Sequence, residues 1–106
     1  MSYDLRMVMD VGAGNERSVT EWRNPTYNLG EMFAEALGRR IREMRGVTGA
    51  EAEPILRAAV AAMESDPLRF KALNPPNGWG CYEDALNTLR WMLEESMTCP
   101  SARWQT

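Results

Sequence analysis

Two cysteines are the strongest nucleophiles in this 106-residue chain, which contains no histidine. Cys81 stands at the expected start of a helix, where the helix dipole lowers the pKa of a thiol. A catalytic thiol also needs a base, and the lack of histidine removes the commonest one. Cys81 and Cys99 flank one predicted helix, so their Cα atoms should lie roughly 27 Å apart, too far for a disulfide. We expect two structural cysteines and no metal site, because two thiols without a close CxxC pair cannot build a zinc centre.

Acidic side chains are the other candidates for catalysis. Glycoside hydrolysis, for example, requires two carboxyl groups at a fixed separation in a cleft. No pattern in the sequence marks such a cleft. The carboxylates suit helix caps and solvated helix faces instead: Glu31, Glu35, Glu83, Asp84, Glu94 and Glu95. We therefore expect a protein that is not an enzyme and that uses no cofactor.

The segment GAGNER, residues 12–17, has the first two glycines of a dinucleotide-binding fingerprint. That fingerprint requires a third glycine where Arg17 stands, and a helix where the pattern here indicates a strand. A hairpin turn is the better interpretation.

The segment NPPNGWGCYEDAL, residues 74–86, is the candidate binding loop. Its prolines favour an extended backbone, Asn77-Gly78 is a strong turn signal, and Gly80 permits a close approach of the chain. The start of the following helix offers free N–H groups that could bind an anion. The alternative is a rigid corner in which Trp79 fills the core. The candidate binding residues are Tyr27, Asn28, Asn74, Asn77, Trp79, Gly80 and Tyr82.

Trp91 is expected on the polar face of the last helix. It follows Tyr82 by nine residues, which at about 100° per residue turns it roughly 180° away. Either the helix is covered on both sides, or Trp91 and its neighbour Glu94 form a protein interface, where tryptophan is enriched. A cluster of four arginines could grip a phosphate or simply form a solvated helix end: Arg39, Arg40, Arg42 and Arg45.

The elements that must position these residues follow from hydrophobic periodicity. Alternation predicts a strand over 3–10, a second over 17–22 and a short last strand over 101–106. Helical spacing predicts helices over 29–45, from about 49 or 54 to 65, over 66–73 and over 81–98. Capping boxes are expected at Asn28–Glu31 and Thr48–Glu51, with ion pairs of Arg39 to Glu35 and Glu43. Pro54 either starts the second helix or bends it.

These elements predict an α+β fold in a single domain, residues 1–106. A small antiparallel sheet, made of the N-terminal hairpin and the C-terminal strand, should pack against three main helices. The net charge of −3 makes a nucleic-acid partner unlikely. There is no apolar run near 18 residues and no apolar leader, so we expect no membrane contact and a cytoplasmic protein.

The segments NPTYNLGEMFAEAL and NPPNGWGCYEDALNTLRWMLEE resemble a group of short proteins encoded by actinobacterial viruses and their hosts. That group shares a TYN-like segment before the first helix and an ALNPPNGWGxYExAL-like segment before the last. The matching positions are Thr26, Tyr27, Asn28, 72–80, Tyr82, Glu83, Ala85 and Leu86. The resemblance covers most of the chain and implies a bacteriophage or prophage origin. It brings no activity with it, and its motif has no cysteine at position 81.

Two functions follow as expectations. The first is a non-enzymatic accessory protein that binds a host protein or itself in the cytoplasm of a bacterial host, as a host-takeover or anti-defence factor. The second is a small-molecule binder that sequesters a nucleotide-like, anionic ligand through stacking and anion capture.

Overall fold

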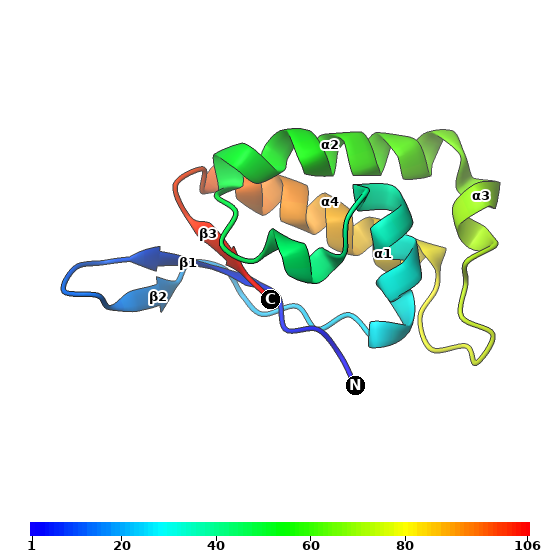
Figure 1. The fold of residues 1–106 in the computed structure, drawn as a ribbon, viewed down its shortest axis with the longest axis horizontal. Coiled ribbons are helices and arrows are strands. Elements are labelled where there is room, and N and C mark those ends of the chain that lie inside the picture. Colours follow the sequence, from blue (N-terminus) through cyan, green and yellow to red (C-terminus); the bar gives the residue numbers. More distant parts are fainter.

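The computed structural model describes all 106 residues (Figure 1). Along the chain it contains three strands, four α-helices and two short 3₁₀ helices. Their bounds are β1 Arg6–Asp10, β2 Glu16–Ser18, η1 Tyr27–Leu29, α1 Gly30–Leu37, η2 Ile41–Met44, α2 Gly49–Ser65, α3 Pro67–Lys71, α4 Tyr82–Thr98 and β3 Arg103–Gln105. None of the helices is long and apolar enough to cross a membrane.

The sheet is antiparallel with strand order β2-β1-β3, which confirms the predicted α+β architecture. Met7 lies opposite Trp104 in one pair, and Met9 lies opposite Arg17 in the other. The β1–β2 hairpin projects from the helical body (Figure 1). All three strands are shorter than predicted. After Ser18 the ladder is interrupted, because the hydroxyl of Thr20 accepts the hydrogen bond of the Met7 N–H at 2.9 Å.

The core lies between the sheet and the helices and forms one cluster of 21 buried residues. Helices α2 and α4 run side by side along it (Figure 1). Trp104 is the largest fully buried side chain, and its Nε1–H donates to the Ser96 hydroxyl at 2.9 Å. The bond satisfies two polar groups that would otherwise be costly to bury.

The predicted helix over 29–45 is wrong as a single element. It ends at Leu37, and Gly38 takes a left-handed backbone with φ of +71°. The chain then turns, and η2 inserts Ile41 and Met44 into the core from a separate short helix. The left-handed conformation costs glycine little, which makes residue 38 a natural place to end a helix.

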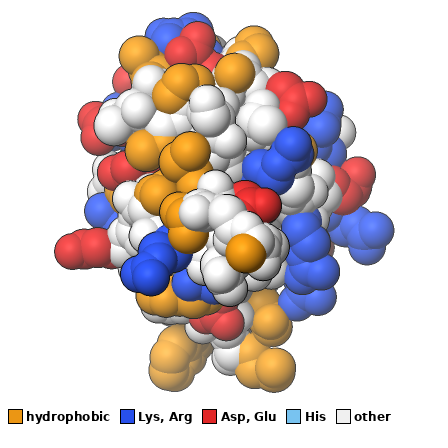
Figure 2. All heavy atoms as spheres, turned by 90° about the vertical axis from the view of Figure 1, so that its left-hand side faces the viewer, with side chains coloured by type: hydrophobic (Ala, Val, Ile, Leu, Met, Phe, Trp, Pro, Cys, Tyr) orange, Lys and Arg blue, Asp and Glu red, His pale blue; other side chains and the backbone are white.

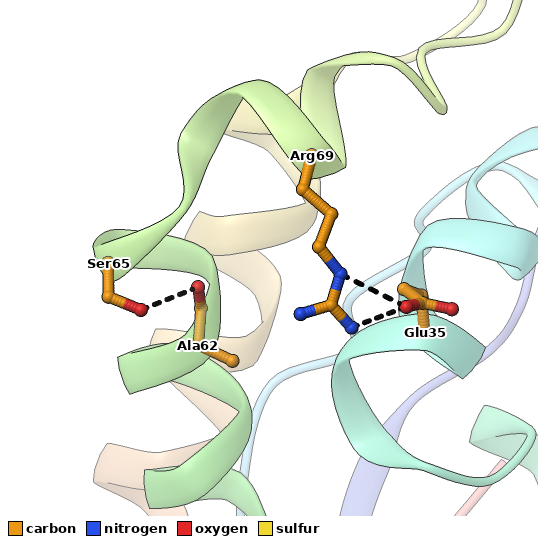
Figure 3. A network of polar contacts seen from close by, with 4 residues as sticks. All are labelled: Glu35, Ala62, Ser65 and Arg69. Carbon is orange, nitrogen blue, oxygen red and sulfur yellow. Dashed lines mark hydrogen bonds and ion pairs between the residues drawn. The ribbon is translucent and has the colours of Figure 1, made fainter.

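The local contacts predicted for that helix are also replaced. The Asn28 N–H is capped by the Thr26 hydroxyl at 3.3 Å, so the expected Asn28–Glu31 box does not form. Neither expected ion pair of Arg39 forms. Glu35 instead pairs with Arg69 of α3, whose Nε donates to Glu35 Oε1 at 3.1 Å (Figure 3), and Glu43 pairs with Arg40 at 3.5 Å. These pairs tie α3 to α1 and fix the turn before η2.

The capping box of α2 is confirmed: Thr48 and Glu51 exchange backbone and side-chain hydrogen bonds. The helix therefore begins at Gly49, not near Pro54, which lies inside it. Gly49 is fully enclosed by the end of α4. A Cβ at this position would meet the Ser96 carbonyl oxygen at 2.6 Å and the Pro100 Cα at 3.0 Å. The missing side chain is what allows α2 to start against α4.

We expect Gly49→Ala to lower the free energy of unfolding by about 2 kcal/mol, because the added methyl group meets backbone atoms that cannot move aside. Urea unfolding followed by circular dichroism measures the change. Ala50→Ser is the matched control, since it adds one atom at the next, exposed position and should stay within about 0.5 kcal/mol of the parent. Equal unfolding midpoints for Gly49→Ala and the parent would show that the contact is not tight.

Candidate functional site

The candidate site is the connection between α3 and α4, which docks on the turn that begins α1. Figure 1 shows this connection descending beside the start of α1. Gly80 makes the contact, with a left-handed φ of +95°. A Cβ at Gly80 would meet the Thr26 methyl at 2.8 Å and the Leu29 Cγ at 3.0 Å. The close approach predicted at Gly80 is therefore made to the turn at Thr26 and Leu29 of the same chain.

A short series of side-chain hydrogen bonds holds the docked loop. Asn77 accepts from the Trp79 N–H at 3.0 Å and donates to the Asn28 side-chain oxygen at 3.3 Å. Asn28 in turn donates to the Thr26 hydroxyl at 2.9 Å. The two motifs singled out in the sequence, residues 26–28 and 74–80, thus contact each other directly. This contact holds the backbone at Trp79 in place.

Trp79 points outward, and 69% of it is exposed. The interpretation in which it fills the core is wrong. It borders a surface hollow of about 490 Å³. The hollow has no charged side chain in its lining, which consists of Met1, Ser2, Asn24, Thr26, Asn28, Asn77 and Trp79.

The N-terminal lining of this hollow was not predicted. Ser2 reaches it because residues 2 and 26 form an isolated bridge, and the Tyr27 N–H donates to the Met1 carbonyl oxygen at 3.1 Å. Pairing across so many residues leaves no local signal in the sequence. Thr26 carried a usable signal, since threonine is a favoured N-cap residue, and it directly precedes η1.

The predicted anion site at the start of α4 is not formed. The side-chain oxygen of Asn74 accepts from the Tyr82 N–H at 2.8 Å, and the Asp84 carboxylate accepts from the Cys81 N–H at 3.1 Å. A hydrogen bond from its own backbone N–H, with help from Cys81, lowers the pKa of Glu83. Two carboxylates therefore surround a helix start whose donors are already used, and an incoming anion would be repelled.

Tyr82 lies below the surface. Its ring is buried and its hydroxyl donates to the Met63 carbonyl oxygen at 2.6 Å, which ties α4 to α2. Tyr82 therefore supports the loop from inside. Its predicted place on the binding surface is wrong, because its side chain is buried. Tyr27 is half-buried, with its ring 4.6 Å from that of Tyr3 and the Arg42 guanidinium 5.0 Å above it.

Three of the four clustered arginines have different partners, and Arg39 is exposed. Arg42 lies over Tyr27, Arg40 pairs with Glu43, and Arg45 donates to the Thr106 carbonyl oxygen at 3.0 Å. They do not form the single phosphate grip considered from their spacing, because the turn into η2 directs these side chains to different partners.

Trp91 is covered on both sides. Its ring packs edge-to-face on Trp104 with centroids 5.4 Å apart, and the Arg23 guanidinium lies 5.1 Å from its centre. This matches the interpretation in which α4 is sandwiched between layers. Glu94, three residues on, is exposed. An interface at Trp91 and Glu94 stays a prediction and would involve only the smaller part of Trp91 that is left exposed.

Cys81 is held in its protonated form. Its Sγ lies 3.3 Å from Asp84 Oδ2, to which it donates. The backbone N–H of Asp84 lowers the pKa of the thiol, but burial and the carboxylates of Asp84 and Glu83 outweigh it, and the net pKa is raised. A raised pKa reduces the thiolate fraction and with it nucleophilicity. The structure has no group of three or more acidic or cysteine side chains arranged to hold a metal ion.

Comparisons with protein-family models, with curated proteins and with solved structures find no match to the chain. The resemblance to bacteriophage proteins therefore stays an expectation, and function has to be argued from the loop itself.

We expect Gly80→Ala to destabilise the loop more than Gly78→Ala does. Both glycines have a left-handed backbone, which costs an alanine about 1 kcal/mol. Only at Gly80 does the new methyl group also strike Thr26 and Leu29, since nothing lies within 4 Å of a Cβ at Gly78. Hydrogen exchange of the Trp79 N–H measures the difference. Similar exchange rates in the two variants would contradict the docking.

We expect Asp84→Asn to speed alkylation of Cys81 by iodoacetamide several-fold near neutral pH. Removing the carboxylate lowers the pKa of the thiol, so more thiolate is present. Mass spectrometry gives the rate, with Cys99 in the same chain as the internal reference. Asp66→Asn changes a carboxylate remote from Cys81 along the chain and should leave the rate unchanged. An unaltered rate in Asp84→Asn would show that Asp84 does not control the pKa of the Cys81 thiol.

Proposed function

We propose that the protein is a non-enzymatic accessory factor of the bacteriophage type, which acts by binding a protein, either a host component or a second copy of itself. The observation that supports this most is Trp79: a tryptophan that is 69% exposed and stands on a loop fixed by its own hydrogen bonds. An exposed tryptophan on an ordered loop is the kind of side chain that anchors a protein interface.

The rigidity of the loop suits it for binding. Asn77 is bonded on both sides, to Trp79 and to Asn28, and Gly80 is packed against Leu29. A loop that is already ordered loses little conformational entropy when a partner arrives, so more of the contact energy appears as affinity. Tryptophan is also the side chain most often found to dominate the energy of an interface.

The chemistry of the hollow favours a protein over a small anion. Its lining offers amides and hydroxyls around one aromatic ring, with no basic side chain. Such a surface resembles the centre of a protein interface, which is poor in charge and rich in aromatic residues. The amides of Asn24, Asn28 and Asn77 both donate and accept hydrogen bonds, which suits the backbone groups of a polypeptide.

The resemblance to short viral proteins supports a host component as the partner. In that setting the protein works in the cytoplasm of the bacterial host, as a host-takeover or anti-defence factor. No enzymatic step is part of the proposal, since the carboxylates around the loop serve as helix caps and Cys81 has a raised pKa.

We expect Trp79→Ala to weaken partner binding by about 2 kcal/mol, or roughly thirtyfold, while the free energy of unfolding stays within about 0.5 kcal/mol of the parent. Affinity capture from lysate of a bacterial host, with bound proteins quantified by mass spectrometry, measures retention. Light scattering on the eluting protein reports self-association in the same samples.

Leu68→Ala is the matched control, because Leu68 is 80% exposed and lies on α3, outside the hollow. It removes a comparable apolar side chain and should leave binding unchanged. If the two variants retain partners and oligomeric state equally, Trp79 is not the contact, and the proposal fails.

A further inference from the structure

A second hollow, of about 590 Å³, lies over the outer face of the sheet and shares no lining residue with the hollow at Trp79. Figure 2 looks at this end of the molecule and shows Lys and Arg side chains gathered along one flank. Three of the lining residues are arginines from separate parts of the chain, Arg6 of β1, Arg45 after η2 and Arg103 of β3. Trp22 also borders the hollow.

Hydrogen bonds to oxygens of the protein hold the three guanidinium groups in place. Arg6 Nε donates to Gln105 Oε1 at 2.6 Å, and Arg103 Nη1 donates to the Gly46 carbonyl oxygen at 2.8 Å. Arg45 Nη2 donates to the Thr106 carbonyl oxygen at 3.0 Å.

These bonds connect the three arginines through neighbouring residues. Gln105 precedes Thr106, and Arg45 precedes Gly46. Arg6 lies opposite Gln105 in the sheet, so Arg103, two residues before Gln105, is its diagonal neighbour at about 7–8 Å on the same face. The sheet register thus places Arg6 and Arg103 on one face, and the bond to Thr106 holds Arg45 beside the end of β3. The hydrogen bonds order these side chains before any ligand binds.

No Asp or Glu side chain forms an ion pair with these arginines. The four ion pairs of the protein involve Arg40, Arg57, Arg69 and Arg90, so none of the three has an Asp or Glu side chain within 4.0 Å. Each guanidinium has five N–H donors, and most of them stay available. In addition, the Thr106 hydroxyl is buried without a hydrogen-bond partner. Unused donors around one hollow are suited to an oxyanion.

Trp22 adds an aromatic surface at the same place. The Arg6 guanidinium lies 4.2 Å from the centre of its ring, and half of the side chain is exposed. Stacking on a tryptophan is favourable for any planar base. Two carboxylates, Asp4 and Glu16, also line the hollow and would repel a long chain of phosphates.

We infer that this hollow binds a nucleoside monophosphate. The phosphate contacts the guanidinium groups of Arg6, Arg45 and Arg103, and the planar base stacks on the exposed surface of Trp22. The inference is independent of the protein partner proposed for Trp79, because the two surfaces share no residue. The nucleotide would bind at this hollow and not at the loop before α4, because the N–H donors at the start of α4 are already used.

The test is a titration of the isotope-labelled full chain with adenosine 5′-monophosphate, inorganic phosphate and adenosine, followed by nuclear magnetic resonance at low salt. The monophosphate should shift the Trp22 indole signal and the amides of Arg6, Arg103 and Gln105. It should bind roughly tenfold more tightly than inorganic phosphate, because only it gains base stacking. No shift at these positions with ligand at about 10 mM would overturn the inference.

Substitutions separate the contributions of the arginines and of Trp22 to binding. Arg103→Gln should weaken the monophosphate roughly tenfold, since a charge-assisted hydrogen bond is lost. Arg39→Gln is the control of equal charge change, because Arg39 is exposed and outside the hollow. Trp22→Ala should abolish the advantage of the monophosphate over inorganic phosphate. Equal weakening by Arg39→Gln, or an unchanged advantage in Trp22→Ala, would contradict the site. If Arg103→Gln unfolds, Arg45→Gln provides the same comparison.

Discussion

The burial of Trp104 joins the parts of this molecule that would otherwise be separate. Its backbone lies opposite Met7 in the sheet and exchanges hydrogen bonds with Gly46 and Val47, the segment that leads into α2. Its side chain reaches Ser96 on α4. One residue therefore links the sheet, α4 and the start of α2. The close approach at Gly49 and the position of the outer-face arginines both depend on that link.

Local signals in the sequence were sufficient for α2 and α4. The Thr48–Glu51 box and the apolar faces of both helices are decided within a few residues, so periodicity and capping place them well. The break at Gly38 was missed because Leu37, Ile41 and Met44 keep helical spacing across it. The same three residues are buried from two helices instead of one, and spacing alone does not distinguish these arrangements.

The candidate site was predicted in part. Its loop and its partner segment were both recognised, but their mutual contact depends on Gly80 meeting Leu29, which lies far away in the sequence. The outward direction of Trp79 follows from that contact, so no local pattern in the sequence could predict it. The donors at the start of α4 were misjudged for a different reason, since Asn74 and Asp84 cap the helix from within the same segment of the sequence. Long-range packing decides what such a loop presents to solvent.

The pairing of β1 with β3 has a consequence for the order of folding events. It joins Arg6 to Gln105 across 99 residues, whereas β1 and β2 close over a short turn. Closing a long loop costs entropy before its contacts compensate, so distant pairings form slowly. We therefore expect the hairpin and the helices to form before the last strand docks, which leaves Leu5 and Met7 incompletely covered until then. That waiting state, with apolar strand residues exposed, is the species most prone to aggregate, and the arrival of Trp104 ends it.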